Sequence, residues 1–153
     1  MLMHVRGLAA AVAIAVLGAA VASANTPRTI VIKGGDDMKY DVVAITAKPG
    51  EMLRVQFVTT GKIPKFAMAH NFVLLKTGTD AKAFADKAMQ ATPDSSYIPA
   101  AMKGQVIAFT PLAGPGEKVE VTFKAPAAPG KYEYICTFPG HFAAGMRGVL
   151  TVK

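Results

Sequence analysis

The sequence predicts an all-β fold, an eight-stranded Greek-key sandwich or barrel with one short helix outside the barrel. Short runs of β-prone residues recur along the chain, several of them alternating between apolar and polar side chains. Gly, Pro and Asp residues separate these runs and indicate turns. Apolar residues at helical spacing occur convincingly in one stretch after the first 24 residues. This pattern of many short strands is typical of a sandwich or barrel.

The first 24 residues have the features of a secretory signal peptide. A short polar start contains Arg6, an apolar run covers residues 8–21, and Ala22-Ser23-Ala24 resembles a cleavage site. A retained membrane anchor is the alternative, but the run is short for a spanning helix, which needs about 20 residues. We therefore expect residues 1–24 to be removed and residues 25–153 to form a single periplasmic domain, with no stable insertion in the membrane.

The expected strands are short and follow one another at regular intervals. Segment 70–76 has too many successive apolar residues for an exposed strand, so we expect it to be covered on both faces. In segment 131–136 the two-residue period of a strand places Tyr132, Tyr134 and Cys136 on one face. The expected strands are 29–33, 40–46, 53–57, 70–76, 105–110, 118–124, 131–136 and 148–153.

The one expected helix follows the fourth strand. Ala81, Phe84 and Ala88 recur at helical spacing, and Thr79 is the expected N-cap. Segment 92–101 contains two prolines and is expected to be irregular, closing over the barrel or packing on its side.

Composition narrows the class of function. The formal charge of +7 favours an acidic partner surface or an anionic membrane face. Nucleic acid is a poor fit, because the lysines are spread along the chain and the signal segment directs export. A single Cys in an exported protein cannot form an internal disulfide, so Cys136 is a free thiol, an intermolecular bridge or a metal ligand.

The segment around this cysteine carries the chemistry. Residues 136–146 read Cys-Thr-Phe-Pro-Gly-His-Phe-Ala-Ala-Gly-Met, so a thiolate, an imidazole and a thioether share one short loop. Beyond the signal segment the other histidine is His70. The set His70, Cys136, His141 and Met146 is typical of a mononuclear blue-copper electron-transfer centre. We therefore expect one copper ion as cofactor. Because His70 comes from an earlier strand than Cys136, we expect the site to join two sheets and to stabilise the fold when the metal binds.

Other interpretations use fewer of these residues. Zinc also accepts two His and one Cys. A Cys–His pair can act as an activated nucleophile, but no third orienting group is evident, and an inward thiol beside tyrosines is poorly placed for a substrate. Met146 taken alone would be core filler.

Two motifs resemble the azurin and plastocyanin family of cupredoxins, with azurins and auracyanins nearest. They are segment 68–74, Met-Ala-His-Asn-Phe-Val-Leu, and the loop 136–146. The likeness extends over nearly all of residues 25–153, including segments 97–100 and 116–123. The sequence departs from azurins in having four residues between His141 and Met146, Ala69 before the first His, Phe72 in place of Trp, and no second Cys.

The resemblance implies a role for each residue. His70, Cys136 and His141 would be the equatorial ligands and Met146 the weak axial ligand. The backbone amides of Asn71 and Phe138 would donate hydrogen bonds to the Cys136 sulfur. The helix near Phe84 would be the flap that the family carries outside the barrel.

The expected function is a monomeric electron carrier, not an enzyme, shuttling single electrons between cytochrome- or reductase-type donors and acceptors. The resemblance implies that the His141 ring edge is the electron port, within an apolar docking patch made of Ile63, Ala67, Met68, Pro139, Phe142, Ala143 and Ala144. Lys62, Lys65 and Arg147 would steer the protein toward an acidic partner. The alternative is a copper carrier or chaperone without redox turnover. A copper oxidase or nitrite reductase is disfavoured, because two histidines cannot also furnish a multi-histidine catalytic centre.

Overall fold

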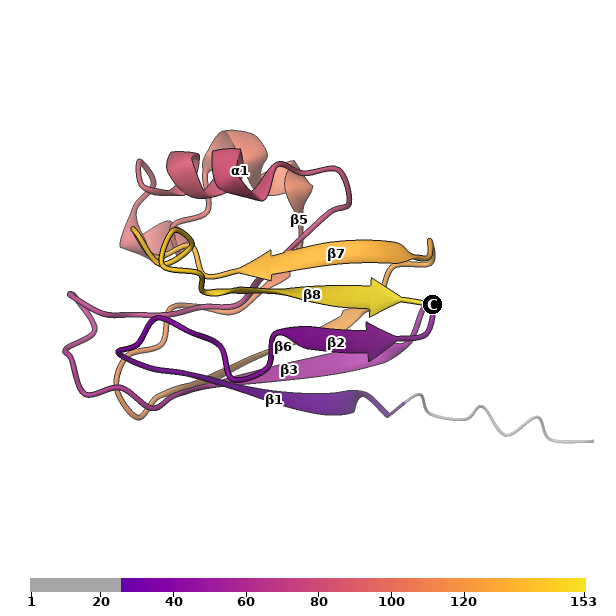
Figure 1. Cartoon of the computed structure of the whole chain (residues 1–153), viewed down its shortest axis with the longest axis horizontal. Helices are drawn as coiled ribbons and strands as arrows, with labels where there is room; N and C mark the ends of the chain where they lie inside the picture. The colour runs from indigo at the N-terminus through magenta and orange to yellow at the C-terminus, as the bar shows by residue number, and fades with distance from the viewer. Residues whose placement is uncertain (1–25) are drawn as a thin grey trace, which may run out of the picture.

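The computed structural model describes residues 26–153, which form two facing β-sheets with a helical segment on the outside (Figure 1). The expected signal peptide, residues 1–24, lies outside the described residues. The predicted all-β fold with eight strands and one short α-helix is confirmed. The strands are β1 (Arg28–Gly34), β2 (Ala44–Ala47), β3 (Met52–Thr59), β4 (Val73–Leu75), β5 (Val106–Phe109), β6 (Lys118–Lys124), β7 (Gly130–Ile135) and β8 (Arg147–Val152).

Most strands that are neighbours in a sheet are not consecutive in the sequence. One sheet has the order β1-β3-β6 and the other β2-β8-β7-β4-β5. Strands β1 and β3 are parallel, as are β2 and β8, and the remaining neighbours are antiparallel. Most successive strands change sheet, the exceptions being β4 to β5 and β7 to β8, so most connections cross the ends of the sandwich as in Greek-key folds. One such end carries the loop between β7 and β8.

The core between the sheets follows from strand alternation. In β3 every second residue is buried, and Leu53, Val55 and Phe57 are fully enclosed. Tyr132 and Tyr134 of β7 enter the same cluster, together with Cys136 and Met146 beyond the strand ends. The expectation that Tyr132, Tyr134 and Cys136 share a face is therefore confirmed. Both sulfur-bearing residues of the loop are part of the hydrophobic core.

Strand β4 is covered on both faces, as its unbroken apolar sequence predicts. Phe72 and Leu74 belong to the core between the sheets, whereas Val73 and Leu75 pack in a second cluster under the helix. The strand is shorter than the expected 70–76. Residues 70–72 lie outside the strand, and His70 makes only an isolated bridge to Ala113.

Helix α1 (Ala81–Ala88) packs on the outer face of the five-stranded sheet through Phe84, which is fully buried with Ile98 and Ile135. Its N-cap is Asp80, not Thr79 as expected. The Asp80 carboxylate accepts a hydrogen bond from the Ala83 amide at 3.0 Å, which an N-cap oxygen does for the third helical residue. The irregular segment that follows contains two 3-10 turns, η1 (Pro93–Ser95) and η2 (Ala100–Gln105).

Strand β2 begins later than expected, at Ala44 in place of residue 40. Tyr40 forms a single bridge with Gly34, and its side chain turns into the core. The Asp41 carboxylate accepts from the Lys33 amide at 2.6 Å, so residues 35–41 close a loop before β2 starts. Among the described residues, no helix is both long and apolar enough to cross a bilayer.

Candidate metal centre

The antiparallel pairing of β7 with β8 places the two ends of the candidate ligand loop opposite each other. Ile135 pairs with Arg147, so the next positions outward are Cys136 and Met146. The Cys136 amide donates to the Met146 carbonyl at 3.1 Å and continues the ladder by one step. Between them the chain turns through Gly140 and Gly145, which both have positive φ angles. The loop therefore leaves and returns at a single point of the sheet.

His70 lies just before the neighbouring strand β4, close to the same point of the sheet. Strand β4 pairs with β7, with Val73 opposite Ile135. Two hydrogen bonds of 3.0 and 2.8 Å between His70 and Ala113 fix the backbone just before this strand. His70 and Cys136 thus come from adjacent strands of one sheet. The expectation that the site joins the two sheets is wrong, because β4 and β7 are hydrogen-bonded neighbours.

Three ligand atoms converge in a buried cluster. The Nδ1 atoms of His70 and His141 lie 3.1 Å apart, and the Cys136 sulfur lies 3.5 Å from His141 Nδ1. All three ligand atoms lie within 4.8 Å of one another. Metal–nitrogen and metal–sulfur bonds of about 2.0 and 2.3 Å in a trigonal plane require separations of about 3.5 Å between the nitrogens and 3.8 Å between nitrogen and sulfur. The observed separations of 3.1 and 3.5 Å are close to these values, and the third is at most 4.8 Å.

Burial sets the protonation states of these groups. It lowers the pKa of His141 to about 4, with a further contribution from the neighbouring His70. Burial also lowers the pKa of His70. The same cause raises the pKa of the Cys136 thiol to about 12, although the amides of Asn71 and Phe138 donate to its sulfur and oppose the rise. At neutral pH the imidazoles are therefore ready to bind a cation, whereas the thiol has to release its proton when the metal enters.

The polar atoms of this cluster are poorly satisfied by the protein alone. The Nδ1 atoms of His70 and His141 face each other at 3.1 Å, and the Cys136 sulfur lies 3.5 Å from His141 Nδ1. Buried imidazoles and a buried thiol without stronger partners are costly. A soft or borderline cation between one thiolate and two imidazoles would account for their burial, and this donor set suits copper.

A hydrogen-bond network that sequence reasoning missed links the two strands behind the ligands. The Asn71 side chain donates to the Ser96 carbonyl at 3.0 Å and to the Thr137 hydroxyl at 2.8 Å, and it accepts from the Thr137 amide at 2.9 Å. Asn71 follows His70 and Thr137 follows Cys136. The network therefore fixes the residues next to two candidate ligands. No signal in the sequence pairs these positions, because 66 residues separate them.

Met146, the fourth predicted residue, lies at the other end of the loop from Cys136. It is fully buried, and its amide donates to the His141 carbonyl at 3.0 Å. A Cβ atom at Gly34 would lie 2.5 Å from the Met146 methyl carbon and 2.9 Å from the Phe57 ring, so a larger residue at this position would displace these side chains. The structure thus brings all four predicted residues, His70, Cys136, His141 and Met146, to one end of the sandwich.

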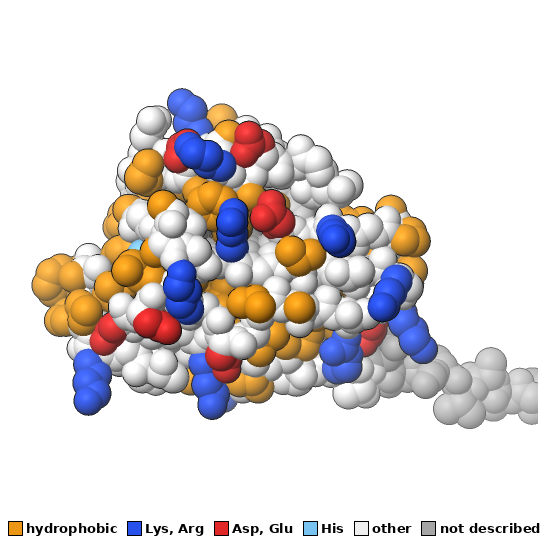
Figure 2. Space-filling model, viewed as in Figure 1, with side chains coloured by type: hydrophobic (Ala, Val, Ile, Leu, Met, Phe, Trp, Pro, Cys, Tyr) orange, Lys and Arg blue, Asp and Glu red, His pale blue; other side chains and the backbone are white. Residues whose placement is uncertain are grey.

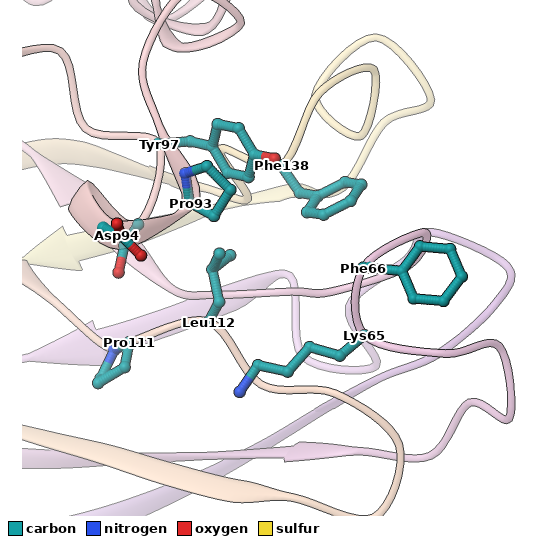
Figure 3. Close-up of a pocket in the computed structure, with 9 residues that line it drawn as sticks. Lys65, Phe66, Pro93, Asp94, Tyr97, Pro111, Leu112 and Phe138 are labelled. Carbon is teal, nitrogen blue, oxygen red and sulfur yellow. The ribbon is translucent and has the colours of Figure 1, made fainter.

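Aromatic rings connect this cluster with a surface cavity. The centroids of the Phe138 and His141 rings lie 4.7 Å apart, and Tyr97 packs edge-on against Phe138 with a centroid distance of 5.4 Å. Both rings line a cavity of about 680 Å³, which Figure 3 shows between them and Phe66. Phe66 is 87% exposed and was not predicted as a surface residue of interest. Its exposure marks this end of the molecule as apolar.

The expected docking patch surrounds the same end. Ile63 and Ala67 are exposed, as expected for a docking patch. His141, the expected electron port, is only 2% exposed, so little of its ring reaches the surface. Figure 2 shows hydrophobic side chains gathered at the left end, around a small histidine surface. Of the expected steering residues, Lys65 is paired with Glu117 at 2.7 Å, and the Arg147 guanidinium lies 5.1 Å from the centre of the Phe142 ring.

Comparisons with known proteins agree with this site. A family model described as copper binding proteins, plastocyanin/azurin family, matches residues 28–153. Auracyanin-A of Chloroflexus aurantiacus is 38% identical over 133 residues, which cover 86% of this chain and 78% of the relative. Azurin of Pseudomonas aeruginosa is 36% identical over 151 residues, covering 97% of this chain and 99% of the relative. Auracyanin-B of Chloroflexus aurantiacus is 33% identical over 136 residues, and the chain spans 56% of its length.

Solved structures give the same result. The dithionite-reduced auracyanin of Roseiflexus castenholzii superposes with a TM-score of 0.72 at 38% identity, covering 82% of this chain and 96% of that chain. Auracyanin A of Chloroflexus aurantiacus, described as a "blue" copper protein, superposes with the same TM-score and covers 83% of this chain and 99% of that chain. The resemblance inferred from the two sequence motifs is confirmed. The chain therefore belongs to the plastocyanin/azurin family of copper-binding proteins, and copper is its cofactor.

Proposed function

We propose that this chain is a type 1 blue copper protein that carries single electrons between larger redox proteins in the periplasm. His70, Cys136, His141 and Met146 would hold the copper ion, which would supply the one-electron chemistry. Residues 1–24 are removed as a signal peptide, and residues 25–153 act as one domain. The observation that carries the proposal is the convergence of one buried thiol with two buried imidazoles at a single end of the sandwich.

The protein's part in electron transfer is to hold its ligands still. Bound copper supplies the chemistry by alternating between Cu(II) and Cu(I). The network of Asn71, Thr137 and Ser96 fixes the backbone beside His70 and Cys136, so their side chains have little freedom to move. The ligand atoms of His70, Cys136 and His141 lie within 4.8 Å of one another. A preorganised set of ligands keeps the reorganisation between the two oxidation states small.

The apolar end of the molecule is where a partner would dock. Phe138 lies against His141 and also lines the surface cavity. A partner that covers this end is therefore separated from His141 by a single aromatic ring. Phe66 and Ile63 extend the apolar surface on the neighbouring loop. An apolar surface of this kind suits brief, weak encounters with redox proteins. The excess of basic residues over the whole surface favours acidic partners.

Burial favours an electron carrier over a copper carrier. His70 and Cys136 are fully buried and His141 is 2% exposed, so handing the ion to another protein would require the loop to open. Removal of an electron through the ring of His141 needs no such opening. The proposal also makes the protein a carrier and not an enzyme, because the copper ligands themselves leave no further histidine among the described residues for a catalytic metal.

Protein-film voltammetry of copper-loaded residues 25–153 tests the proposal. A reversible one-electron couple that persists over repeated cycles supports it. Rapid loss of copper to a chelator on reduction would favour the copper carrier instead. The steering component is tested by the electron-transfer rate with an acidic cytochrome at several ionic strengths, where a rate independent of salt would remove it.

A further inference from the structure

The loop between β1 and Tyr40 lies against the Met146 end of the ligand loop. The ammonium group of Lys39 donates a hydrogen bond to the Ala144 carbonyl. A Cβ atom placed on Gly145 would come within 2.7 Å of the Lys39 Nζ atom. At the base of the same loop, Gly34 faces the methyl group of Met146. Residues 34–39 therefore contact the ligand loop at two points. Lys39 and Ala144, which form one of these contacts, are 105 residues apart in the sequence.

The backbone of Lys39 is held on both sides, which gives its side chain a fixed starting point. Gly34 and Tyr40 form an antiparallel bridge that closes the loop. Within the loop the Met38 amide donates to the Gly35 carbonyl at 2.9 Å, and Met38 itself has a left-handed φ angle of 55°. The Tyr40 hydroxyl donates to the Asn71 carbonyl at 2.5 Å and anchors the far side in the core.

The two ends of the ligand loop are secured differently. The Cys136 end is tied to distant residues through the buried network of Asn71 and Thr137. At the Met146 end, the Met146 carbonyl accepts from the Cys136 amide at 3.1 Å, and the turn before it is closed by bonds within the loop, from Met146 to His141 at 3.0 Å and from Gly145 to Phe142 at 2.9 Å. Residues 142–145 of this turn can shift about the Cys136–Met146 pair unless another element holds them. The Lys39 ammonium supplies this hold through a charge-assisted hydrogen bond.

We propose that Lys39 is a positioning residue that clamps the Met146 end of the copper-binding loop. This rests on the proposed function, since it assigns Met146 to the copper site. The clamp limits how far Met146 moves from the other ligands. The fixed positive charge also disfavours Cu(II) relative to Cu(I), because the oxidised centre carries one more positive charge, and so it raises the reduction potential. The charge lies in an exposed position, so added salt weakens this second effect.

The test compares three variants with the wild type. Lys39→Met removes the ammonium and keeps a linear side chain, and Lys39→Arg keeps a cationic donor. Lys131→Met is the matched control, since it removes the same charge from β7 near Gly130, at the opposite end of that strand from Cys136. Hydrogen exchange of amides 142–146 is measured on metal-free protein, and the release of zinc to a chelator is measured on zinc-loaded protein. Voltammetry on copper-loaded protein at low and high ionic strength gives the potential.

Lys39→Met is expected to accelerate both exchange and zinc release by about 3- to 10-fold, as for the loss of one hydrogen bond to a charged donor. It should also lower the copper potential more than Lys131→Met, with the difference shrinking at high salt. Lys39→Arg should stay close to the wild type in exchange. The proposal is overturned if Lys39→Met and Lys131→Met behave alike in exchange and zinc release, or if Lys39→Arg exchanges as fast as Lys39→Met.

These results separate the clamp from the proposed function. Exchange and zinc release involve no electron transfer, so they decide whether Lys39 holds the loop even if the wild-type protein shows no reversible copper couple. Conversely, a reversible couple in every variant with unchanged exchange would leave the electron carrier intact and refute the clamp.

Discussion

Replacement of Asn71 by alanine should destabilise the metal-free protein far more than an exposed polar substitution. The change deletes two donor bonds of 3.0 and 2.8 Å and the acceptor of the Thr137 amide at 2.9 Å. Thr137 is 2% exposed, so its amide loses its partner where water has little access. An unsatisfied buried amide costs about 1–3 kcal/mol, and a lost hydrogen bond about 1 kcal/mol. The Ser96 carbonyl keeps the Thr137 hydroxyl at 2.8 Å. The expected loss is therefore about 3 kcal/mol.

Urea unfolding of metal-free residues 25–153 at neutral pH measures this loss. With a slope of about 1.5–2 kcal/mol per molar urea, the midpoint should fall by about 1.5–2 M. Ser95→Ala is the control, because it removes an exposed hydroxyl that donates to the Thr92 carbonyl at 2.8 Å. Its effect should stay within about 0.5 kcal/mol. If Asn71→Ala costs no more than Ser95→Ala, the network does not brace the site and the reasoning from these contacts is refuted.

Three further outcomes are expected. Cys136→Ser should abolish the intense thiolate-to-copper absorption, and survival of the blue band would refute Cys136 as a ligand. Met146→Leu should retain copper and raise the reduction potential measured by voltammetry, because a weak donor to Cu(II) is lost; an unchanged potential would argue against Met146 as the axial group. Metal-free protein should lose stability as the pH falls from about 6.5 toward 4, because His141, with its folded pKa lowered to about 4, takes up a proton more readily in the unfolded chain. Urea midpoints at pH 4.5, 5.5 and 7 check this, and a midpoint that rises on acidification contradicts it.

Local patterning was enough to predict the strands, since most of them bury one face and β4 buries both. Alternation in β3 and β6 predicted their bounds to within two residues, and the apolar run of β4 predicted cover on both faces. The convergence of His70, Cys136 and His141 was also predictable, because the chain has so few thiols and imidazoles that a site needing them has little choice. That prediction rested on the small number of Cys and His residues and on their spacing in residues 136–146.

Contacts across large sequence distances were not predictable in the same way. Asn71 and Thr137 are ordinary polar residues in the sequence, and only the pairing of β4 with β7 brings them together. Lys39 reads as one basic residue among many until the loop before Tyr40 folds against Ala144. The N-cap is Asp80 and not Thr79: both side-chain types can cap a helix, and it is the Asp80 carboxylate that accepts from the Ala83 amide.

The assignment of the site to the junction of two sheets failed for a related reason. A strand that is distant in sequence from Cys136 need not lie in the other sheet, and in this Greek-key order β4 lies directly beside β7. The hydrogen-bonded neighbour therefore supplies His70. This arrangement gives the ligands a stiffer base than two separate sheets would, because backbone pairing and the side-chain network act on the same two strands.

Visible absorption combined with electron paramagnetic resonance of copper-loaded residues 25–153 tests the central claim most directly. One copper ion per chain, an intense blue charge-transfer band and the small copper hyperfine splitting of a thiolate-bound Cu(II) centre are predicted. A nearly colourless protein, with the large splitting of copper held only by nitrogen and oxygen donors, would contradict the shared site of His70, Cys136 and His141.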